Sequence, residues 1–151
     1  MKFLILTLSV LSLTGFGVLN AEDLKSGEYK ISQSWKQERS FERLYVVSVP
    51  EGRKGKRPVV IFLHGGGGNA RGAFKGFIRR HRGMARHYIV ICPEGECRGW
   101  NIVSERSKAD DRGFIEEIIK KVSECDNVQR ENFSIIGSSN GAALVNQLAI
   151  E

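Results

Sequence analysis

The feature that most constrains the fold is the segment Gly137-Ser138-Ser139-Asn140-Gly141, a serine with a glycine two residues to either side. The apolar run 133–136 precedes it, and the apolar residues 142–145 follow it. This order predicts a strand that turns sharply into a helix, with Ser139 at the tip of the turn. Side chains at the two glycine positions would collide with the neighbouring backbone in such a turn. The segment therefore predicts an exposed serine hydroxyl held in a strained backbone conformation.

Strands and helices alternate along the rest of the chain. Residues 59–63 and 88–92 are continuous apolar runs, as expected for strands buried on both faces of a parallel sheet. Residues 41–49 alternate loosely and predict an outer strand that ends in a charged turn. Helices are predicted over 73–86 and over 110–124, where apolar residues recur at helical spacing. The pattern predicts an α/β fold with one hydrophobic core.

A glycine-rich loop, His64-Gly65-Gly66-Gly67-Gly68, follows the first of these buried strands. Ester hydrolysis through a serine needs two backbone N–H groups that receive the developing oxyanion. With Ser139 as the nucleophile, we predict that the amides of Asn140 and of Gly65 or Gly66 are these donors. The alternative is a loop that makes a tight turn or cradles phosphate. Neither the G-x-x-x-x-G-K-[ST] nor the G-x-G-x-x-G motif fits the segment, which favours the oxyanion loop.

Five short motifs follow one another along the chain: Arg57-Pro58-Val59-Val60-Ile61-Phe62-Leu63-His64-Gly65-Gly66-Gly67-Gly68-Asn69-Ala70, Cys92-Pro93-Glu94-Gly95, Trp100-Asn101, Asp110-Asp111-Arg112-Gly113-Phe114-Ile115 and Gly137-Ser138-Ser139-Asn140-Gly141-Ala142. In this order they resemble the secreted polyhydroxybutyrate depolymerase and feruloyl esterase family, over the N-terminal half of such an enzyme. The resemblance implies an α/β-hydrolase fold and cleavage of carboxylic ester bonds through an acyl-enzyme on Ser139. It implies a polyester, a feruloyl-polysaccharide or a small ester as substrate. It also implies that Trp100-Asn101 and Asp110-Asp111 are structural supports.

The remaining members of a catalytic triad do not follow the serine in this chain. In α/β-hydrolases the acid and then the histidine come after the nucleophile. After Ser139 the chain holds one acidic residue, Glu151, and no histidine, and we expect His64 to orient the glycine-rich loop. Residues 22–151 are therefore expected to be the N-terminal part of a single catalytic domain, truncated after the nucleophile turn and its helix. The alternative is a catalytically inactive fragment or a non-catalytic binding domain.

The first residues have the pattern of a secretory signal peptide. Met1-Lys2 precedes residues 3–19, which carry no charge and are mostly apolar, and small and acidic residues follow at 20–23. We predict a signal peptide over residues 1–21 and a secreted protein, extracellular or periplasmic. A membrane anchor is the alternative, but the apolar stretch is shorter than the roughly 20 residues that span a bilayer. No membrane partner is predicted after cleavage.

Charge and metal-ligand spacing predict neither a nucleic-acid partner nor a cofactor. Cleavage removes one of 23 Lys and Arg and none of 17 Asp and Glu, so the mature chain carries 22 minus 17, or +5. The densest cluster, Arg79-Arg80-His81-Arg82 with Arg86 and His87, lacks interleaved aromatic residues and is predicted to be a solvated helix face. The histidines and cysteines lack the spacing of metal ligands. In an exported chain Cys92, Cys97 and Cys125 permit one disulfide, with the pairing left open.

Overall fold

The computed structural model describes residues 22–52, 55–103 and 106–150. The predicted signal peptide, residues 1–21, and the terminal Glu151 lie outside the described residues. Within the described ranges, no helix is both long and apolar enough to cross a bilayer.

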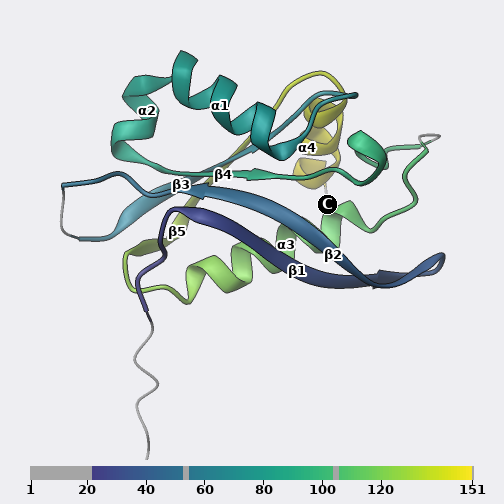
Figure 1. Ribbon diagram of the computed structural model, residues 1–151, viewed down its shortest axis with the longest axis horizontal. Helices are drawn as coiled ribbons and strands as arrows, with labels where there is room; N and C mark the ends of the chain where they lie inside the picture. Colours follow the sequence, from purple (N-terminus) through teal and green to yellow (C-terminus); the bar gives the residue numbers. More distant parts are fainter. Residues whose placement is uncertain (1–21, 53–54, 104–105, 151) are drawn as a thin grey trace, which may run out of the picture.

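Three strands come first among the described elements, and helical segments alternate with single strands after them (Figure 1). Along the chain they are β1 (Gly27–Trp35), β2 (Glu38–Ser48), β3 (Arg57–Leu63), α1 (Ala70–Arg80), α2 (Arg82–His87), β4 (Ile89–Pro93), the 3₁₀ turn η1 (Glu96–Arg98), α3 (Asp111–Ser123), β5 (Val128–Gly137) and α4 (Asn140–Ile150). The predicted α/β fold is confirmed, and so is the strand and helix pair on either side of Ser139.

The strands form one mixed sheet in the order β1-β2-β4-β3-β5. The first two pairs, β1 with β2 and β2 with β4, are antiparallel. In contrast, β3 pairs in parallel with β4 on one side and with β5 on the other. The carboxyl ends of β3, β4 and β5 therefore meet at the same edge of the sheet, where ligand sites of open α/β sheets form.

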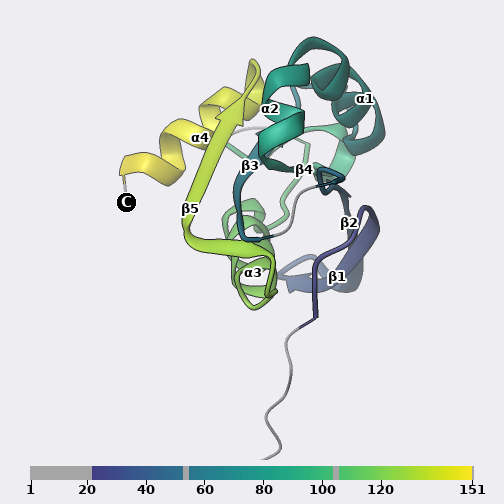
Figure 2. The ribbon, with the colours of Figure 1, turned by 90° about the vertical axis from the view of Figure 1, so that its left-hand side faces the viewer.

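Helices cover both faces of the sheet, and the alternation of side chains along β3 and β4 creates the two halves of the core. Val59, Ile61 and Leu63 contribute to a cluster that includes Phe114 and Ile118 of α3 and Leu144 of α4. The residues between them on the same strands point to the other face, where they pack with Phe77 of α1. Figure 2 shows α1 and α2 on one side of the sheet and α3 on the other. Burial on both faces explains why these strands are continuous apolar runs.

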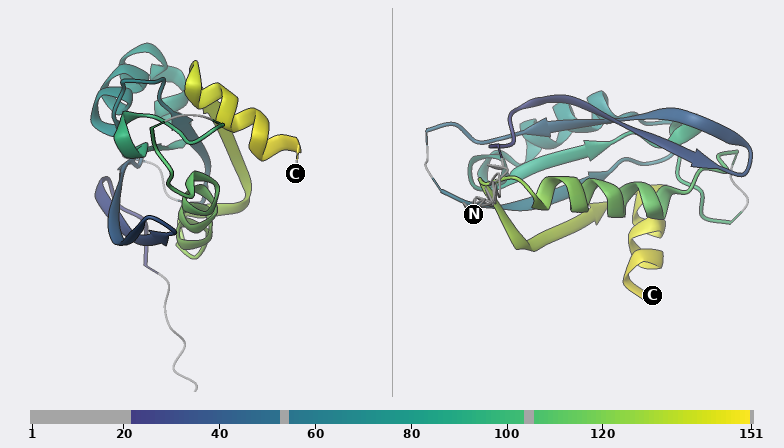
Figure 3. Two further views of the ribbon diagram at one scale, coloured as in Figure 1. Left: turned by 90° about the vertical axis from the view of Figure 1, so that its right-hand side faces the viewer. Right: turned by 90° about the horizontal axis from the view of Figure 1, so that it is seen from below.

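The N-terminal part of the sheet differs from the prediction. Strand β1 was not anticipated because its side chains are mostly polar and exposed, with Ile31 as its one fully buried residue. Strand β2, predicted to be an outer strand, lies between β1 and β4. Only residues 45–48 of β2 pair with β4, so the β1–β2 ribbon extends beyond the rest of the sheet, as Figure 3 shows from below.

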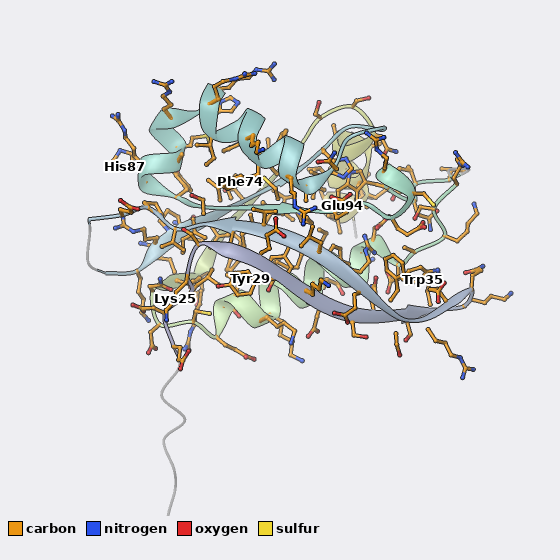
Figure 4. The ribbon with its side chains drawn as sticks, viewed as in Figure 1. Lys25, Tyr29, Trp35, Phe74, His87 and Glu94 are labelled. Atoms are coloured by element: carbon orange, nitrogen blue, oxygen red, sulfur yellow. The ribbon has the colours of Figure 1, made fainter. Side chains whose placement is uncertain are left out.

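The helix predicted over 73–86 is two helices separated at His81. The first, α1, begins three residues earlier than predicted because two acceptors satisfy amides in its first turn. The Asn69 side-chain oxygen accepts a hydrogen bond from the Gly72 amide at 2.7 Å, and the Glu94 carboxylate accepts one from the Ala70 amide. Figure 4 labels Glu94 between the sheet and the start of α1. The turn after β4 is thereby tied to the loop that follows β3.

Candidate active site

Ser139 lies at the tip of a two-residue turn between β5 and α4 and is exposed. Its φ angle is +50°, in the left-handed region that residues other than glycine rarely occupy. A Cβ atom added to Gly137 would lie 2.3 Å from the carbonyl oxygen of Gly141, and one added to Gly141 would lie 2.5 Å from that of Leu63. The two glycines are therefore required by backbone contacts on either side of the serine.

The strain at Ser139 has a measurable consequence for stability. Replacing Ser139 with glycine is expected to raise the free energy of unfolding by about 1 kcal/mol, because glycine adopts a positive φ angle without the cost of a side chain. Urea unfolding of the two proteins at equal pH measures the difference. A destabilised Ser139→Gly variant would show that the hydroxyl contributes more to the fold than the conformation costs.

The glycine-rich loop packs directly against this turn. A Cβ atom on Gly65 would lie 3.3 Å from the Ser138 carbonyl oxygen and 3.4 Å from the Ser139 Cβ atom. A Cβ atom on Gly66 would lie 3.8 Å from that of Asn140. The Ser138 amide donates a hydrogen bond to the Leu63 carbonyl at 3.0 Å, which joins the ends of β3 and β5. The structure thus brings together the serine and the residues that the sequence predicted around it.

Three backbone amides beside Ser139 lack an acceptor within the described part of the chain. The amides of Gly67 and Gly68 donate to the carbonyl oxygens of Arg98 and Gly65, at 2.8 and 3.0 Å. The amides of Gly65, Gly66 and Asn140, by contrast, form no hydrogen bond with any other residue that the structure describes. These amides belong to the residues that lie next to the serine, and they can donate hydrogen bonds to an anionic oxygen there.

His64 holds the glycine-rich loop in place through hydrogen bonds at both of its ring nitrogens. The Gly95 amide donates to His64 Nε2 at 3.0 Å, so Nε2 is the unprotonated nitrogen and Nδ1 donates to the Gly65 carbonyl at 2.8 Å. The buried Trp100 indole donates from Nε1 to the His64 carbonyl at 2.7 Å, and the two rings lie 5.0 Å apart. Because both ring nitrogens are engaged, His64 orients the loop, as the sequence predicted, and is not poised to take a proton from Ser139.

Asn140 has a second role, through its side chain, that the sequence did not predict. The Trp100 amide donates to Asn140 Oδ1 at 2.7 Å, and Asn140 Nδ2 donates to the Trp100 carbonyl at 3.2 Å. This pair of bonds joins the residue after the serine to the segment that also holds His64. The sequence signal was present, since Trp100 and Asn140 belong to two of the five motifs, but their pairing is a tertiary contact.

A buried ion pair between β2 and the start of α3 supports the segment that carries Trp100. The Arg43 guanidinium lies 2.6 Å from Asp111 Oδ1, both side chains are 1% exposed, and the guanidinium lies 4.0 Å from the Phe114 ring centroid. The Asn101 amide donates to Asp111 Oδ2 at 2.6 Å, and Arg43 donates to the Glu94 carbonyl at 3.1 Å. Burial raises the pKa of Asp111, despite the opposing effect of Arg43. The structural role expected for Asp111 and Asn101 is therefore seen.

The cysteines take no part in this arrangement. All three lie in the described part of the chain as free thiols: Cys92 is buried, Cys125 is half-buried and Cys97 is exposed. Burial raises the pKa of Cys92 to about 12, which keeps it a thiol at neutral pH. Among the described residues, no group of three or more His, Cys, Asp or Glu side chains is placed to hold a metal ion.

Comparison with known proteins identifies an esterase relative and a shared fold. No family model matches the chain. It is 31% identical over 109 residues to an acetylxylan esterase of Coprinopsis cinerea, an alignment that covers 66% of this chain and 29% of that protein. Among solved structures, a thermostable esterase has a TM-score of 0.60 at 20% identity, covering 79% of this chain and 36% of that one. A protein named sOPH has a TM-score of 0.61 at 18% identity, and the match covers 83% of this chain and 47% of that protein.

These likenesses confirm the predicted resemblance at the level of fold and sequence. The chain has the α/β-hydrolase fold, and the acetylxylan esterase is similar to it in sequence. It spans less than half of the length of each of these three proteins.

Proposed function

We propose that this α/β-hydrolase-fold chain is the nucleophile-bearing part of a serine esterase that cleaves carboxylic ester bonds. The proposal rests on one observation above all. An exposed serine at a φ angle of +50° lies beside the amides of Gly65, Gly66 and Asn140, which have no acceptor among the described residues. That combination is what acyl transfer through a serine requires at the reacting carbon.

In the proposed reaction the Ser139 hydroxyl oxygen attacks the ester carbonyl carbon, and the hydroxyl proton passes to a histidine. The carbonyl oxygen becomes an oxyanion that accepts hydrogen bonds from the amides of Asn140 and of Gly65 or Gly66. Collapse of the tetrahedral intermediate expels the alcohol, which takes up the proton from the histidine, and leaves an acyl-enzyme. Water then releases the carboxylic acid by the same route. The histidine and its acid are supplied from outside these 151 residues, as the chain order of the fold requires.

The relative by sequence supports a choice of substrate class for this proposal. The acetylxylan esterase of Coprinopsis cinerea is named for an ester of a polysaccharide. We therefore place acyl esters of polysaccharides, acetyl or feruloyl, first among the substrates, and a polyester such as polyhydroxybutyrate second. The apolar residues 3–19 support a secreted enzyme, which would meet such polymers outside the cell.

The proposed function is tested with the full product of the coding sequence, purified and assayed on 4-nitrophenyl acetate, acetylated xylan, methyl ferulate and polyhydroxybutyrate particles. Hydrolysis of the small ester and of one polymer is expected. Treatment with diisopropyl fluorophosphate, followed by peptide mass mapping, is expected to place the phosphoryl group on Ser139. Absence of both hydrolysis and labelling at Ser139 would leave the inactive or non-catalytic alternative.

The side chain of Asn140 provides a further prediction within the proposed site. Asn140→Ala is expected to lower kcat on 4-nitrophenyl acetate by about tenfold with little change in KM, because two hydrogen bonds to Trp100, each of about 1 kcal/mol, hold the oxyanion amide in place. Asn140→Asp keeps the acceptor for the Trp100 amide and adds a negative charge.

Comparing the two Asn140 variants shows whether this residue lies beside a developing oxyanion or only stabilises the fold. If the site receives an oxyanion, the aspartate variant is the slower of the two, because its charge opposes the developing negative charge. If Asn140 serves only the fold, the aspartate variant is the more active of the two, since it retains one of the two hydrogen bonds to Trp100. Kinetics of both proteins on the same ester decide between these outcomes.

A further inference from the structure

The positive charge of the chain is concentrated on α1 and α2. Residues 70–87 contain six Lys and Arg and no Asp or Glu. The rest of residues 22–151 therefore holds 16 basic and 17 acidic residues, close to balance. The sequence predicted this segment to be a solvated helix face. The structure adds that the segment folds around a groove.

The α1–α2 groove is an open surface depression of about 540 Å³, lined by apolar and cationic side chains only. Its apolar residues are Phe74, Ile78 and Ala85, and its cationic residues are Lys75, Arg79, Arg82 and Arg86. In Figure 4 Phe74 lies on the side of α1 that faces the sheet, while nitrogen-tipped side chains project outward from both helices. The groove shares no lining residue with the Ser139 turn or the glycine-rich loop.

The four cations of the groove have no counter-ion among the residues that the structure places. Arg71, on the same helix, forms an ion pair with Glu28 at 2.6 Å. Lys75, Arg79, Arg82 and Arg86 form no ion pair or side-chain hydrogen bond with any residue in the described ranges. Like charges gathered around one concave surface create a positive potential that attracts anions. The groove therefore favours a ligand that brings negative charge.

The apolar lining restricts which anion fits. An inorganic anion would satisfy the cations and leave Phe74 and Ile78 in contact with water, whereas a neutral apolar molecule would leave the cations uncompensated. We propose that the α1–α2 groove binds an amphiphilic carboxylate, such as a medium-chain fatty acid. Its carboxylate lies against Arg79, Arg82 and Arg86, and its chain covers the apolar residues. The volume is in the range of small-molecule sites, about 300–1,000 Å³.

The test is calorimetric titration of the full product of the coding sequence with decanoate below its micelle concentration. Saturable 1:1 binding is expected, at least tenfold tighter than binding of acetate or of decyltrimethylammonium. Arg79→Gln/Arg82→Gln/Arg86→Gln is expected to weaken decanoate binding by tenfold or more. A matched control, Lys36→Gln/Lys120→Gln/Arg130→Gln, removes the same charge from exposed positions elsewhere and is expected to bind as the unmodified protein does.

Each other outcome overturns the proposal. Equal binding of acetate and decanoate would show a site for anions without an apolar part, and equal binding of decyltrimethylammonium would show an apolar surface without charge selection. Unchanged affinity in the arginine variant would place the site elsewhere. Binding to phosphatidylglycerol vesicles without binding of decanoate would identify a membrane surface as the partner. The result is independent of esterase activity, since Ser139→Ala is expected to bind decanoate unchanged.

Discussion

Ser139→Ala is expected to lower kcat/KM for 4-nitrophenyl acetate by about 10⁴-fold or more, because in the proposed reaction the acyl-enzyme forms on the Ser139 hydroxyl. The fold should persist, since the Ser139 side chain is exposed and the turn is formed by backbone hydrogen bonds and the two glycines. The measurement compares steady-state kinetics and thermal unfolding of the variant and the unmodified protein. The residual rate would come from the oxyanion amides and substrate binding alone.

Ser138 is the matched control for this prediction. It precedes Ser139 in the same turn and is also exposed. Its contributions are made by the backbone, which donates to the Leu63 carbonyl and accepts from the Gly141 amide. Ser138→Ala should therefore retain most of the activity. If Ser139→Ala hydrolyses the ester at the unmodified rate, or if both variants lose activity equally, Ser139 is not the nucleophile.

The sequence predicted those parts of the fold that depend on a few consecutive residues. The two glycines around Ser139 are required by contacts within a five-residue turn, and the run 59–63 is apolar because β3 is covered on both faces. Both signals can be found in a short window. Strand β1 gave no such signal, because it is held by pairing with β2 and buries few of its side chains.

The supports of the candidate site depend on contacts between distant parts of the chain. The motif that contains Asp111 is local, but its partner Arg43 lies 68 residues away, directly after the exposed residues 38–42 of β2. The bond from the Gly95 amide to His64 links positions 31 residues apart. Residue type and spacing do not specify such pairings, because each depends on the register in which the strands assemble.

Arg43→Met is expected to lower the free energy of unfolding by about 3–5 kcal/mol at pH 7, because it leaves the Asp111 carboxylate buried without its partner. The double variant Arg43→Met/Asp111→Leu should recover part of this loss, since it removes the second charge but leaves the Asn101 amide without an acceptor. Arg112→Gln, which disrupts an exposed pair with Glu116, is the control and should change stability little. Urea unfolding monitored by tryptophan fluorescence measures all three.

The loss of unfolding free energy in Arg43→Met should also depend on pH, and the Asp111 carboxyl determines whether that loss grows or shrinks as the pH rises. Burial already raises its pKa in the folded protein, and removal of Arg43 raises that pKa further. A carboxyl whose pKa in the folded protein exceeds its unfolded value of about 3.9 binds its proton more tightly when the protein is folded. The free energy of unfolding therefore falls as the pH rises from the unfolded pKa to the folded pKa. The variant should therefore be destabilised less at pH 5 than at pH 8. A loss that is equal at both values would mean that Asp111 keeps its charge without Arg43.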